Sequence, residues 1–172
     1  LFPMKPFQFS VPQDVIVGSG SAEKLGEAAK KLGGTHALII SGPHLTKMGH
    51  VGHCADLLKA AGIASDAFTE TEGNPSTETV AKAAEMYKSC GADFLVAFGG
   101  GSPMDVAKAV AVVAKFGGKI TDYEGAGTVP GEPVPLIALP TTAGTGSEVT
   151  AAAVITDHSR NYKLTVFDAK LI

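Results

Sequence analysis

A glycine-rich turn is the first part of the sequence whose residue types suggest chemistry. Phe94–Phe98 is a continuous apolar run, typical of a strand covered on both faces, and the turn Gly99–Ser102 follows it. We expect a helix from Pro103, with Ser102 as its cap and Asp105 completing a capping box. Backbone N–H groups at such a helix start attract anions, and glycines leave them uncovered. The turn therefore indicates a ligand that carries phosphate.

This turn departs from the two common phosphate motifs. Met104 stands where GxGxxG has its third glycine, and no Gly-Lys-Ser/Thr follows as in a P-loop. Taken alone, the segment fits either a phosphate site or a plain strand-to-helix turn.

A second segment of the same kind lies further along the chain. Pro140–Glu148 follows the apolar run Leu136–Leu139 and is rich in hydroxyls and glycines, although by itself it could be an ordinary polar loop. Both segments leave the carboxyl ends of predicted strands, which is the edge where ligands bind in α/β sheets. Together they favour a nucleotide crevice.

The elements that must position these segments alternate along the chain. Helices are predicted over about Ala22–Leu32, Val51–Ala61, Thr77–Cys90 and Pro103–Phe116. Strands are predicted at Ala37–Ile40, near Ala67 and Phe68, and at Phe94–Phe98 and Leu136–Leu139. This order predicts a Rossmann-like α/β domain over residues 1–172, with a doubly wound, mostly parallel sheet and helices on both faces.

Two further β elements are expected near the ends of the chain. Phe7–Val11 alternates apolar and polar residues and Asp14–Val17 follows, which indicates a β element around 7–17. Residues 151–167 read as a hairpin that turns around Asp157–Asn161. Leu1–Pro3 precede Met4 and receive no function.

Composition narrows the class of protein. The chain has 172 residues, of which 45% are hydrophobic and 18% charged, enough for one domain with a real core. The net charge is −3 and the basic residues are scattered, so nucleic acid and membrane partners are not expected. Two isolated cysteines, Cys54 and Cys90, are expected to be reduced thiols, and the absence of an apolar span or export signal favours a soluble cytoplasmic protein.

Two small clusters carry residue types that suggest other sites. His50 and His53 precede Cys54 at a spacing that places them on one helix face, but we interpret them as a helix start rather than metal ligands. Asp157-His158-Ser159 contains the residue types of a hydrolase, but a triad requires a geometry that a hairpin turn does not supply. No catalytic residue and no metal ligand is assigned.

The two glycine-rich segments together resemble the motif pair of the iron-containing alcohol dehydrogenases. Gly99-Gly100-Gly101-Ser102-Pro103-Met104-Asp105 and Pro140-Thr141-Thr142-Ala143-Gly144-Thr145-Gly146-Ser147-Glu148 occur in the family's order. Asn74-Pro75 and Asp122–Gly125 are similar to further family segments, so the resemblance covers nearly all of Phe7–Asp168.

This resemblance implies hydride exchange between an alcohol or aldehyde and NAD or NADP, with Fe²⁺ polarising the substrate oxygen. Gly99, Gly100, Gly101 and Ser102 would hold the pyrophosphate, and Thr141, Thr142 and Thr145 would line the adenine and ribose side. Thr150 and Lys163 match further cofactor contacts. The cofactor set expected from the resemblance is completed by Gly42, Asn74 and Asp105.

Two departures from the family qualify this expectation. Family members that prefer NAD tend to carry Asp where Gly42 stands, and glycine removes that carboxylate's repulsion of a 2′-phosphate, so NADP is admitted as well as NAD. The family's iron ligands, an aspartate and three histidines, belong to an all-helical domain that would begin after Ile172. We therefore expect this chain alone to be inactive and to hold no iron.

Several alternatives stay open at this point. The chain is either the NAD(P)-binding half of a dehydrogenase or a stand-alone nucleotide-binding or regulatory domain. A relative of glycerol dehydrogenase or dehydroquinate synthase is a nearer alternative, since that branch also uses a glycine turn. The resemblance also implies a homodimer or higher homo-oligomer through the strand near Phe7–Val11. The substrate among small alcohols, diols and aldehydes is not determined.

Overall fold

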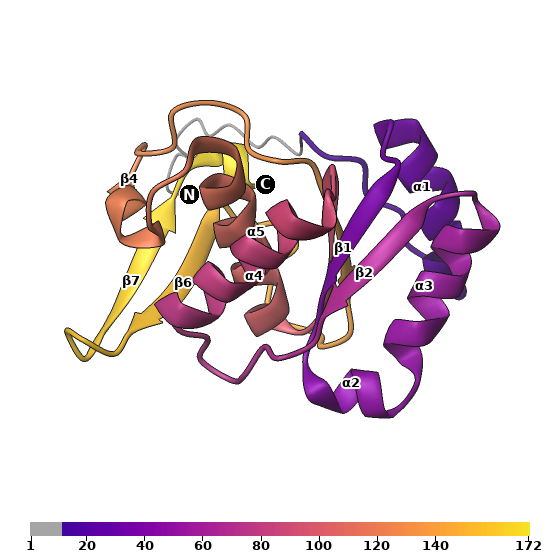
Figure 1. Cartoon of the computed structure of the whole chain (residues 1–172), viewed down its shortest axis with the longest axis horizontal. Helices are drawn as coiled ribbons and strands as arrows, with labels where there is room; N and C mark the ends of the chain where they lie inside the picture. Colours follow the sequence, from indigo (N-terminus) through magenta and orange to yellow (C-terminus); the bar gives the residue numbers. More distant parts are fainter. Residues whose placement is uncertain (1–11) are drawn as a thin grey trace, which may run out of the picture.

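The computed structural model describes residues 12–172, and a four-stranded parallel sheet lies at its centre (Figure 1). Its strands are β1 (His36–Ile40), β2 (Ala64–Phe68), β3 (Phe94–Gly99) and β5 (Leu136–Pro140). They lie in the order β2-β1-β3-β5, and all neighbouring pairs are parallel. Strands β1 and β3 are almost fully buried, as their continuous apolar sequences predict.

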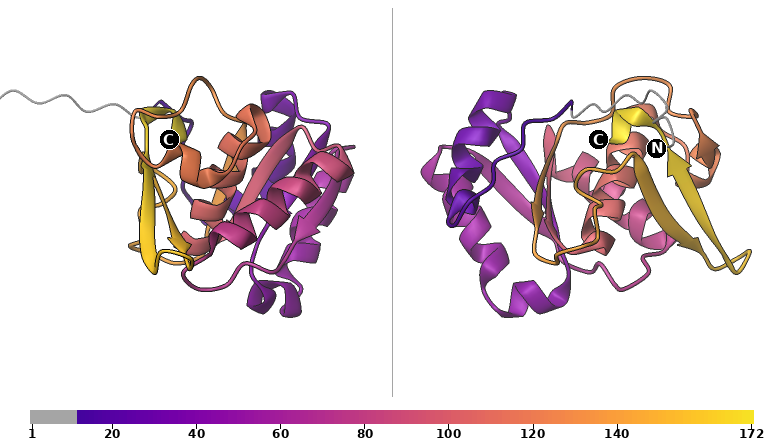
Figure 2. Two further views of the ribbon diagram at one scale, coloured as in Figure 1. Left: turned by 60° about the vertical axis from the view of Figure 1, so that its left-hand side comes forward. Right: turned by 180° about the vertical axis from the view of Figure 1, so that it is seen from behind.

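Helices cover both faces of this sheet, so the predicted doubly wound α/β class is confirmed (Figure 2). One face packs on α1 (Leu25–Leu32) and α3 (His50–Ala60). The opposite face packs on α4 (Thr77–Cys90) and α5 (Gly101–Phe116). Side chains of β1 alternate between the two cores, because successive residues of a strand point to opposite faces.

A second, three-stranded sheet packs on the far side of α5. It contains β4 (Gly125–Ala126), β7 (Tyr162–Phe167) and β6 (Ala152–Asp157), in that order. The antiparallel pair β6 and β7 is the hairpin predicted around residues 151–167. Its separation from the main sheet was not predicted, and it places α5 between two sheets (Figure 1). Short 3₁₀ helices occupy Ser21–Lys24, Ile120–Tyr123 and Ala169–Leu171.

The beginning of the chain differs from the sequence expectation. Phe7–Val11 lies outside the described residues, so its pairing with a second copy stays a prediction. Asp14–Val17 forms no strand, because none of the described strands offers it a partner, and Val15, Ile16 and Val17 are exposed. A turn at Gly18–Gly20 follows, with the Ser21 N–H donating to the Gly18 carbonyl at 3.1 Å.

Other predicted boundaries need small corrections. Strand β2 begins at Ala64, three residues before the predicted Ala67, because its partner β1 pairs with it over its full length. A five-residue helix, α2 (Pro43–Lys47), was not predicted at all.

Across residues 12–172, the longest and most apolar helices still fall short of what crossing a membrane requires.

Helices α1 and α3 approach closely at a glycine. A Cβ at Gly26 would lie 2.7 Å from the Ala61 Cβ and 3.1 Å from the Leu57 carbonyl oxygen. Gly52 is also helical, but nothing lies within 4 Å of the position its Cβ would take. The two glycines therefore offer a matched pair for testing the packing.

We predict that Gly26→Ala lowers the free energy of unfolding by about 1–2 kcal/mol, since overpacking outweighs the gain in helix propensity. Gly52→Ala should raise it by up to about 1 kcal/mol, because only the propensity gain applies. Urea unfolding of both variants measures the difference. Equal stabilisation by both substitutions would show that α1 and α3 are not packed this closely.

Candidate functional site

The candidate site lies at the carboxyl edge of the main sheet, where the strand order reverses. From β1 the chain passes outward to β2, whereas β3 lies on the other side of β1, so the connections after β1 and β3 diverge. Such a switch point leaves a crevice between the two connections. Here a pocket of ≈ 360 Å³ opens at these strand ends, and its lining includes Gly42, Thr71, Gly99, Gly100, Ser102 and Thr141. Residues predicted from three separate segments thus meet at one place.

Helix α5 begins earlier than the sequence predicts. It starts at Gly101, with Gly100 as the N-cap and no side-chain capping bond. The predicted cap at Ser102 is therefore wrong, because Ser102 and Pro103 already lie inside the first turn. N–H groups of a first turn have no acceptor within their own helix. With no side-chain cap, these donors are available for an anion at the pocket.

Gly99 and Gly100 meet requirements that other residues would not, whereas a Cβ at Gly101 would make only ordinary contacts. Gly99 has φ +147°, and a Cβ there would lie 2.7 Å from the Pro103 Cγ. A Cβ at Gly100 would lie 2.9 Å from the Thr142 Oγ1, and one at Gly101 would lie 3.6 Å from the Thr145 Cβ. Bare backbone at this turn is thus what lets the threonine loop lie against it.

The loop after β5 stays attached to the glycine turn through its backbone. The Thr141 N–H donates to the Gly99 carbonyl at 2.9 Å. Thr141, Thr142 and Thr145 are all exposed, so their hydroxyls are accessible beside the turn. The structure therefore brings together the glycine turn and the three threonines that the sequence singled out.

Asp105 does not complete a capping box, as the sequence predicted, because the helix has already passed its first turn there. Its half-buried carboxylate accepts hydrogen bonds from the Ser147 hydroxyl at 2.5 Å and from the Val154 N–H at 3.2 Å. Burial raises the pKa of Asp105, and these two bonds and the nearby Lys108 oppose that shift. The side chain thus connects α5 to the end of the threonine loop and to β6.

Sequence reasoning missed Lys108, which is 3% exposed within the largely apolar helix α5. Its Nζ donates to the carbonyl oxygens of Thr150 at 2.5 Å and Ala152 at 3.3 Å. Burial lowers its pKa to about 8, while Asp105 and Glu148 act in the opposite direction. A lysine inside the apolar run Val106–Val113 is the sequence signal that would have found it.

Asn74 and Lys163 contact each other outside the pocket lining. The Lys163 Nζ donates to the Asn74 Oδ1 at 2.7 Å. Asn74 has a left-handed backbone, with φ 56°, and its neighbour Gly73 lines the pocket. The side chain of Thr150 is exposed, and its backbone carbonyl binds Lys108. These three predicted residues therefore lie at the rim of the crevice or beyond it.

Of the two histidines first considered as metal ligands, His53 has another contact. The His53 Nε2 lies 2.9 Å from a Glu23 carboxylate oxygen, which fits a surface pair. Within residues 12–172, the donor group close enough for an ion is His36, Asp66 and Cys90. His36 begins β1, so this group lies toward the opposite sheet edge from Gly42, and the His36 Nε2 is already 2.8 Å from the Asp66 Oδ2. Cys54 and Cys90 are both free thiols, as expected.

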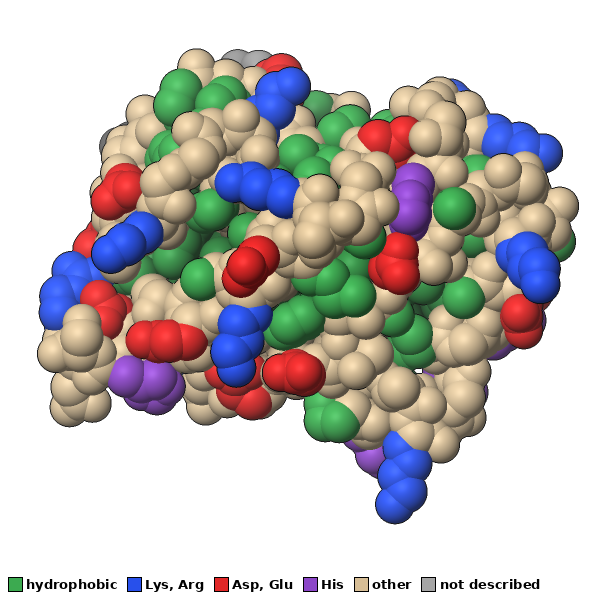
Figure 3. Space-filling view, viewed as in Figure 1, with side chains coloured by type: hydrophobic (Ala, Val, Ile, Leu, Met, Phe, Trp, Pro, Cys, Tyr) green, Lys and Arg blue, Asp and Glu red, His purple; other side chains and the backbone are tan. Residues whose placement is uncertain are grey.

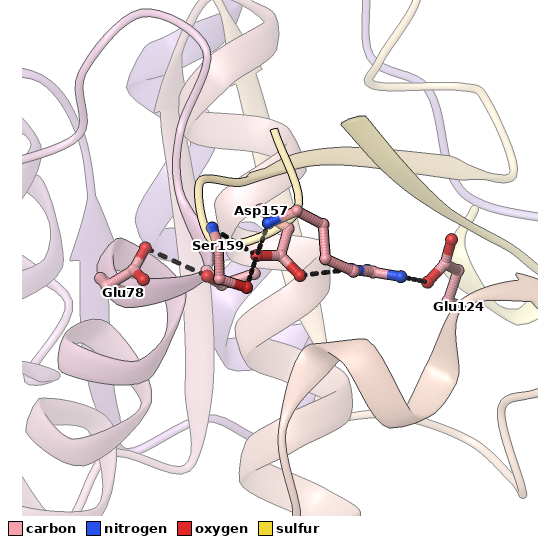
Figure 4. Close-up of polar contacts among 6 residues, drawn as sticks. Glu78, Glu124, Asp157 and Ser159 are labelled. Carbon is pink, nitrogen blue, oxygen red and sulfur yellow. Dashed lines mark hydrogen bonds and ion pairs between the residues drawn. The ribbon is translucent and has the colours of Figure 1, made fainter. Parts of the chain in front are cut away.

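The Asp157-His158-Ser159 segment is the hairpin turn that the sequence predicts (Figure 4). The Asp157 carboxylate accepts from the Ser159 hydroxyl at 2.6 Å and from the Arg160 Nε at 2.6 Å. These two bonds lower the pKa of Asp157 to about 2. Arg160 also donates to Glu124 at 2.8 Å. Asp157 accepts from the serine and the arginine, and this arrangement orders a turn.

On the face seen in Figure 3, basic and acidic side chains are interspersed, and neither sign of charge predominates in one area. This distribution differs from the basic stripe of a nucleic-acid-binding surface.

Comparison with known protein families gives a match over residues 12–172 to the model described as iron-containing alcohol dehydrogenase. The NAD-dependent methanol dehydrogenase of Bacillus methanolicus is 37% identical over 163 residues, which are 95% of this chain and 43% of that protein. The NADPH-dependent butanol dehydrogenase of Clostridium saccharobutylicum is 37% identical over 165 residues, covering 94% and 42%. The chain thus spans less than half the length of these relatives.

Solved structures give the same picture. A crystal structure of 1,3-propanediol oxidoreductase matches 98% of this chain with a TM-score of 0.93 at 31% identity, and 44% of that protein is covered. Sulfoacetaldehyde reductase from Bifidobacterium kashiwanohense, solved in complex with NAD⁺, matches 98% with a TM-score of 0.91 at 32% identity. This chain covers 45% of the sulfoacetaldehyde reductase.

Proposed function

The chain belongs to the iron-containing alcohol dehydrogenase family, and on this basis we propose that it is the NAD(P)-binding part of an alcohol or aldehyde oxidoreductase. The observation that carries the proposal is the pocket at the sheet's switch point, where the uncapped first turn of α5 meets the threonine loop. The family match favours this branch over a glycerol dehydrogenase or dehydroquinate synthase relative.

Each side of the pocket suits a different part of a dinucleotide. The backbone N–H groups of the first turn of α5 would donate to the pyrophosphate, where the helix dipole also favours negative charge. The exposed hydroxyls of Thr141, Thr142 and Thr145 would hydrogen-bond the sugar side, and Gly42 would face the adenine ribose. Asn74, Thr150 and Lys163 would contact the cofactor further along. The nicotinamide supplies the hydride acceptor or donor, and the protein binds and orients it.

We predict that the 172-residue chain binds NADH saturably and that Gly100→Asp abolishes this binding. The added carboxylate would face the pyrophosphate, and its Cβ would displace Thr142. Fluorescence titration with NADH measures the dissociation constant.

Gly52→Asp is the matched control for this experiment, because it adds the same charge on α3 where the Cβ meets nothing within 4 Å. This control should bind NADH like the wild type. An unchanged affinity in Gly100→Asp would reject the assignment of the glycine turn.

Gly42 bears on the choice between NAD and NADP. It lines the pocket directly after β1, with extended backbone at φ −102°, so any residue can adopt its conformation. Glycine at this position presents no carboxylate to a 2′-phosphate. The relatives include both an NAD-dependent and an NADPH-dependent enzyme, and we propose that this chain accepts both cofactors.

Gly42→Asp should therefore weaken NADPH binding at least tenfold more than NADH binding, because the added carboxylate would repel the 2′-phosphate, which NADH lacks. Gly42→Ala serves as the control for the steric part, since a Cβ there would lie 3.1 Å from the Thr71 carbonyl oxygen. The alanine variant should affect the two cofactors equally. Equal weakening by aspartate would reject the charge argument.

The residues present do not fit the family's iron. The described chain offers His36, Asp66 and Cys90 as its one group of three potential ligands, and that group lies toward the opposite sheet edge from the pocket. A catalytic metal has to lie beside the substrate oxygen that it polarises. We propose that the iron ligands and the substrate-binding residues are outside these 172 residues.

This chain alone should accordingly neither retain stoichiometric iron at the crevice nor oxidise an alcohol. After incubation with Fe²⁺ and dialysis, metal analysis of the His36→Ala variant, which lacks one ligand of the group outside the crevice, should find no bound iron. When butanol and NAD are added to the unmodified chain, absorbance at the reduced-cofactor band should not rise. Turnover with stoichiometric iron would overturn this part of the proposal. A stand-alone nucleotide-binding domain would behave identically in this assay, and a longer reading frame with further iron ligands would distinguish the two.

A further inference from the structure

Lys108 is a charged residue in an environment that otherwise excludes charge. It is 3% exposed, and its neighbours in α5, from Val106 to Val113, are buried and apolar. Burying an ammonium group is costly unless its donors are satisfied. Here the Nζ donates to two backbone carbonyls, those of Thr150 and Ala152, and no carboxylate lies within ion-pair distance among the contacts of the described chain. An apolar side chain would fill this position at lower cost, so the lysine calls for an explanation.

Asp105 lies one helical turn before Lys108 and points toward the same segment. Residues three apart share one face of a helix. The Asp105 carboxylate accepts from Ser147 and from Val154, while Lys108 donates to Thr150 and Ala152. Four hydrogen bonds from one face of α5, three to backbone groups and one to the Ser147 hydroxyl, therefore hold the segment between Ser147 and Val154.

That backbone is the continuation of the threonine loop. The Ser147 N–H donates to the Thr145 Oγ1 at 3.4 Å, and the Thr145 Cβ lies 3.6 Å from the position that a Cβ on Gly101 would take. Thr142, at the start of the same loop, lies against Gly100. The loop is attached to β3 at its beginning, through Thr141 and Gly99, and to α5 at its end. Its threonines are thereby held over the turn from both sides.

We propose that Lys108 and Asp105 are positioning residues that hold the Thr141–Thr150 loop over the glycine turn and thereby set cofactor affinity without touching the cofactor. This inference rests on the proposed NAD(P)-binding function. An ammonium can hold two carbonyls and a carboxylate can hold a hydroxyl and an N–H, which no pair of apolar residues can do. Because α5 carries both the anion-binding N-terminus and these two anchors, loop and turn keep a fixed spacing.

The protonation of Lys108 makes the pH dependence of NADH affinity a test that distinguishes positioning of the loop from a general contribution to stability. Burial lowers its pKa to about 8, and the charged groups acting on it are Asp105 on α5 and Glu148 on the loop. Above this pH the amine is neutral, and its bonds to Thr150 and Ala152 lose their charge assistance. NADH affinity of the wild type should therefore fall as pH rises through about 8, whereas Lys108→Met should show low affinity and no such inflection.

The direct experiment titrates NADH into the 172-residue chain and its variants at pH 7 and follows urea unfolding in parallel. Lys108→Met and Asp105→Asn should each weaken binding roughly 10- to 100-fold, the range expected for lost hydrogen bonds to charged groups. Ser147→Ala removes only one hydroxyl and should weaken binding several-fold while folding normally.

Val110→Ala provides the matched control, because Val110 is fully buried on the same helix and its side chain belongs to the apolar core. It should lower stability yet leave NADH affinity unchanged. If the wild type does not bind NADH, the proposed function fails. If the wild type binds and Lys108→Met and Ser147→Ala bind equally well, the positioning inference alone is overturned. If Lys108→Met does not fold, Asp105→Asn and Ser147→Ala decide.

Discussion

The site depends on one requirement: the backbone between β3 and α5 must be free of side chains on the side that faces the crevice. Gly99 turns the chain with φ +147°, directly beside the Pro103 ring, and Gly100 lets Thr142 of the threonine loop approach. A side chain at any of these positions would cover N–H groups that have no helical acceptor. The buried strand β3 and the long helix α5 hold this bare turn in place from both ends.

Helix α5 connects the two halves of the architecture. One part of its surface packs on the parallel sheet, and another packs on β6 of the small sheet. Its apolar length supplies the core, whereas Asp105 and Lys108 supply the polar attachments to the end of the threonine loop and to β6. A change in how the small sheet sits on α5 would therefore be transmitted to the threonine loop, because the same four bonds join them.

Sequence patterns predicted much of this fold because local signals and burial agree in it. Continuous apolar runs such as Ala37–Ile40 are typical of central parallel strands, and glycines close the helices that follow. Contacts between distant segments were harder. Helix α5 begins at Gly101, before the predicted Pro103, and has no side-chain cap of the kind that the sequence prediction relied on. Asp105 was misassigned because its partners, Ser147 and Val154, lie more than 40 residues away. Lys108 was overlooked although it interrupts an apolar run, because its acceptors are backbone carbonyls that a sequence does not display.

The central claim is that the first turn of α5 holds the pyrophosphate of a nicotinamide cofactor. A crystal structure of the 172-residue chain grown with NADH tests it most directly. The account predicts pyrophosphate oxygens within hydrogen-bond distance of backbone N–H groups at Gly101 and Ser102, with the adenosine between the loop that contains Gly42 and the Thr141–Thr145 loop. A cofactor bound elsewhere, for example in the groove between α4 and the Asp157–Arg160 turn, would contradict it.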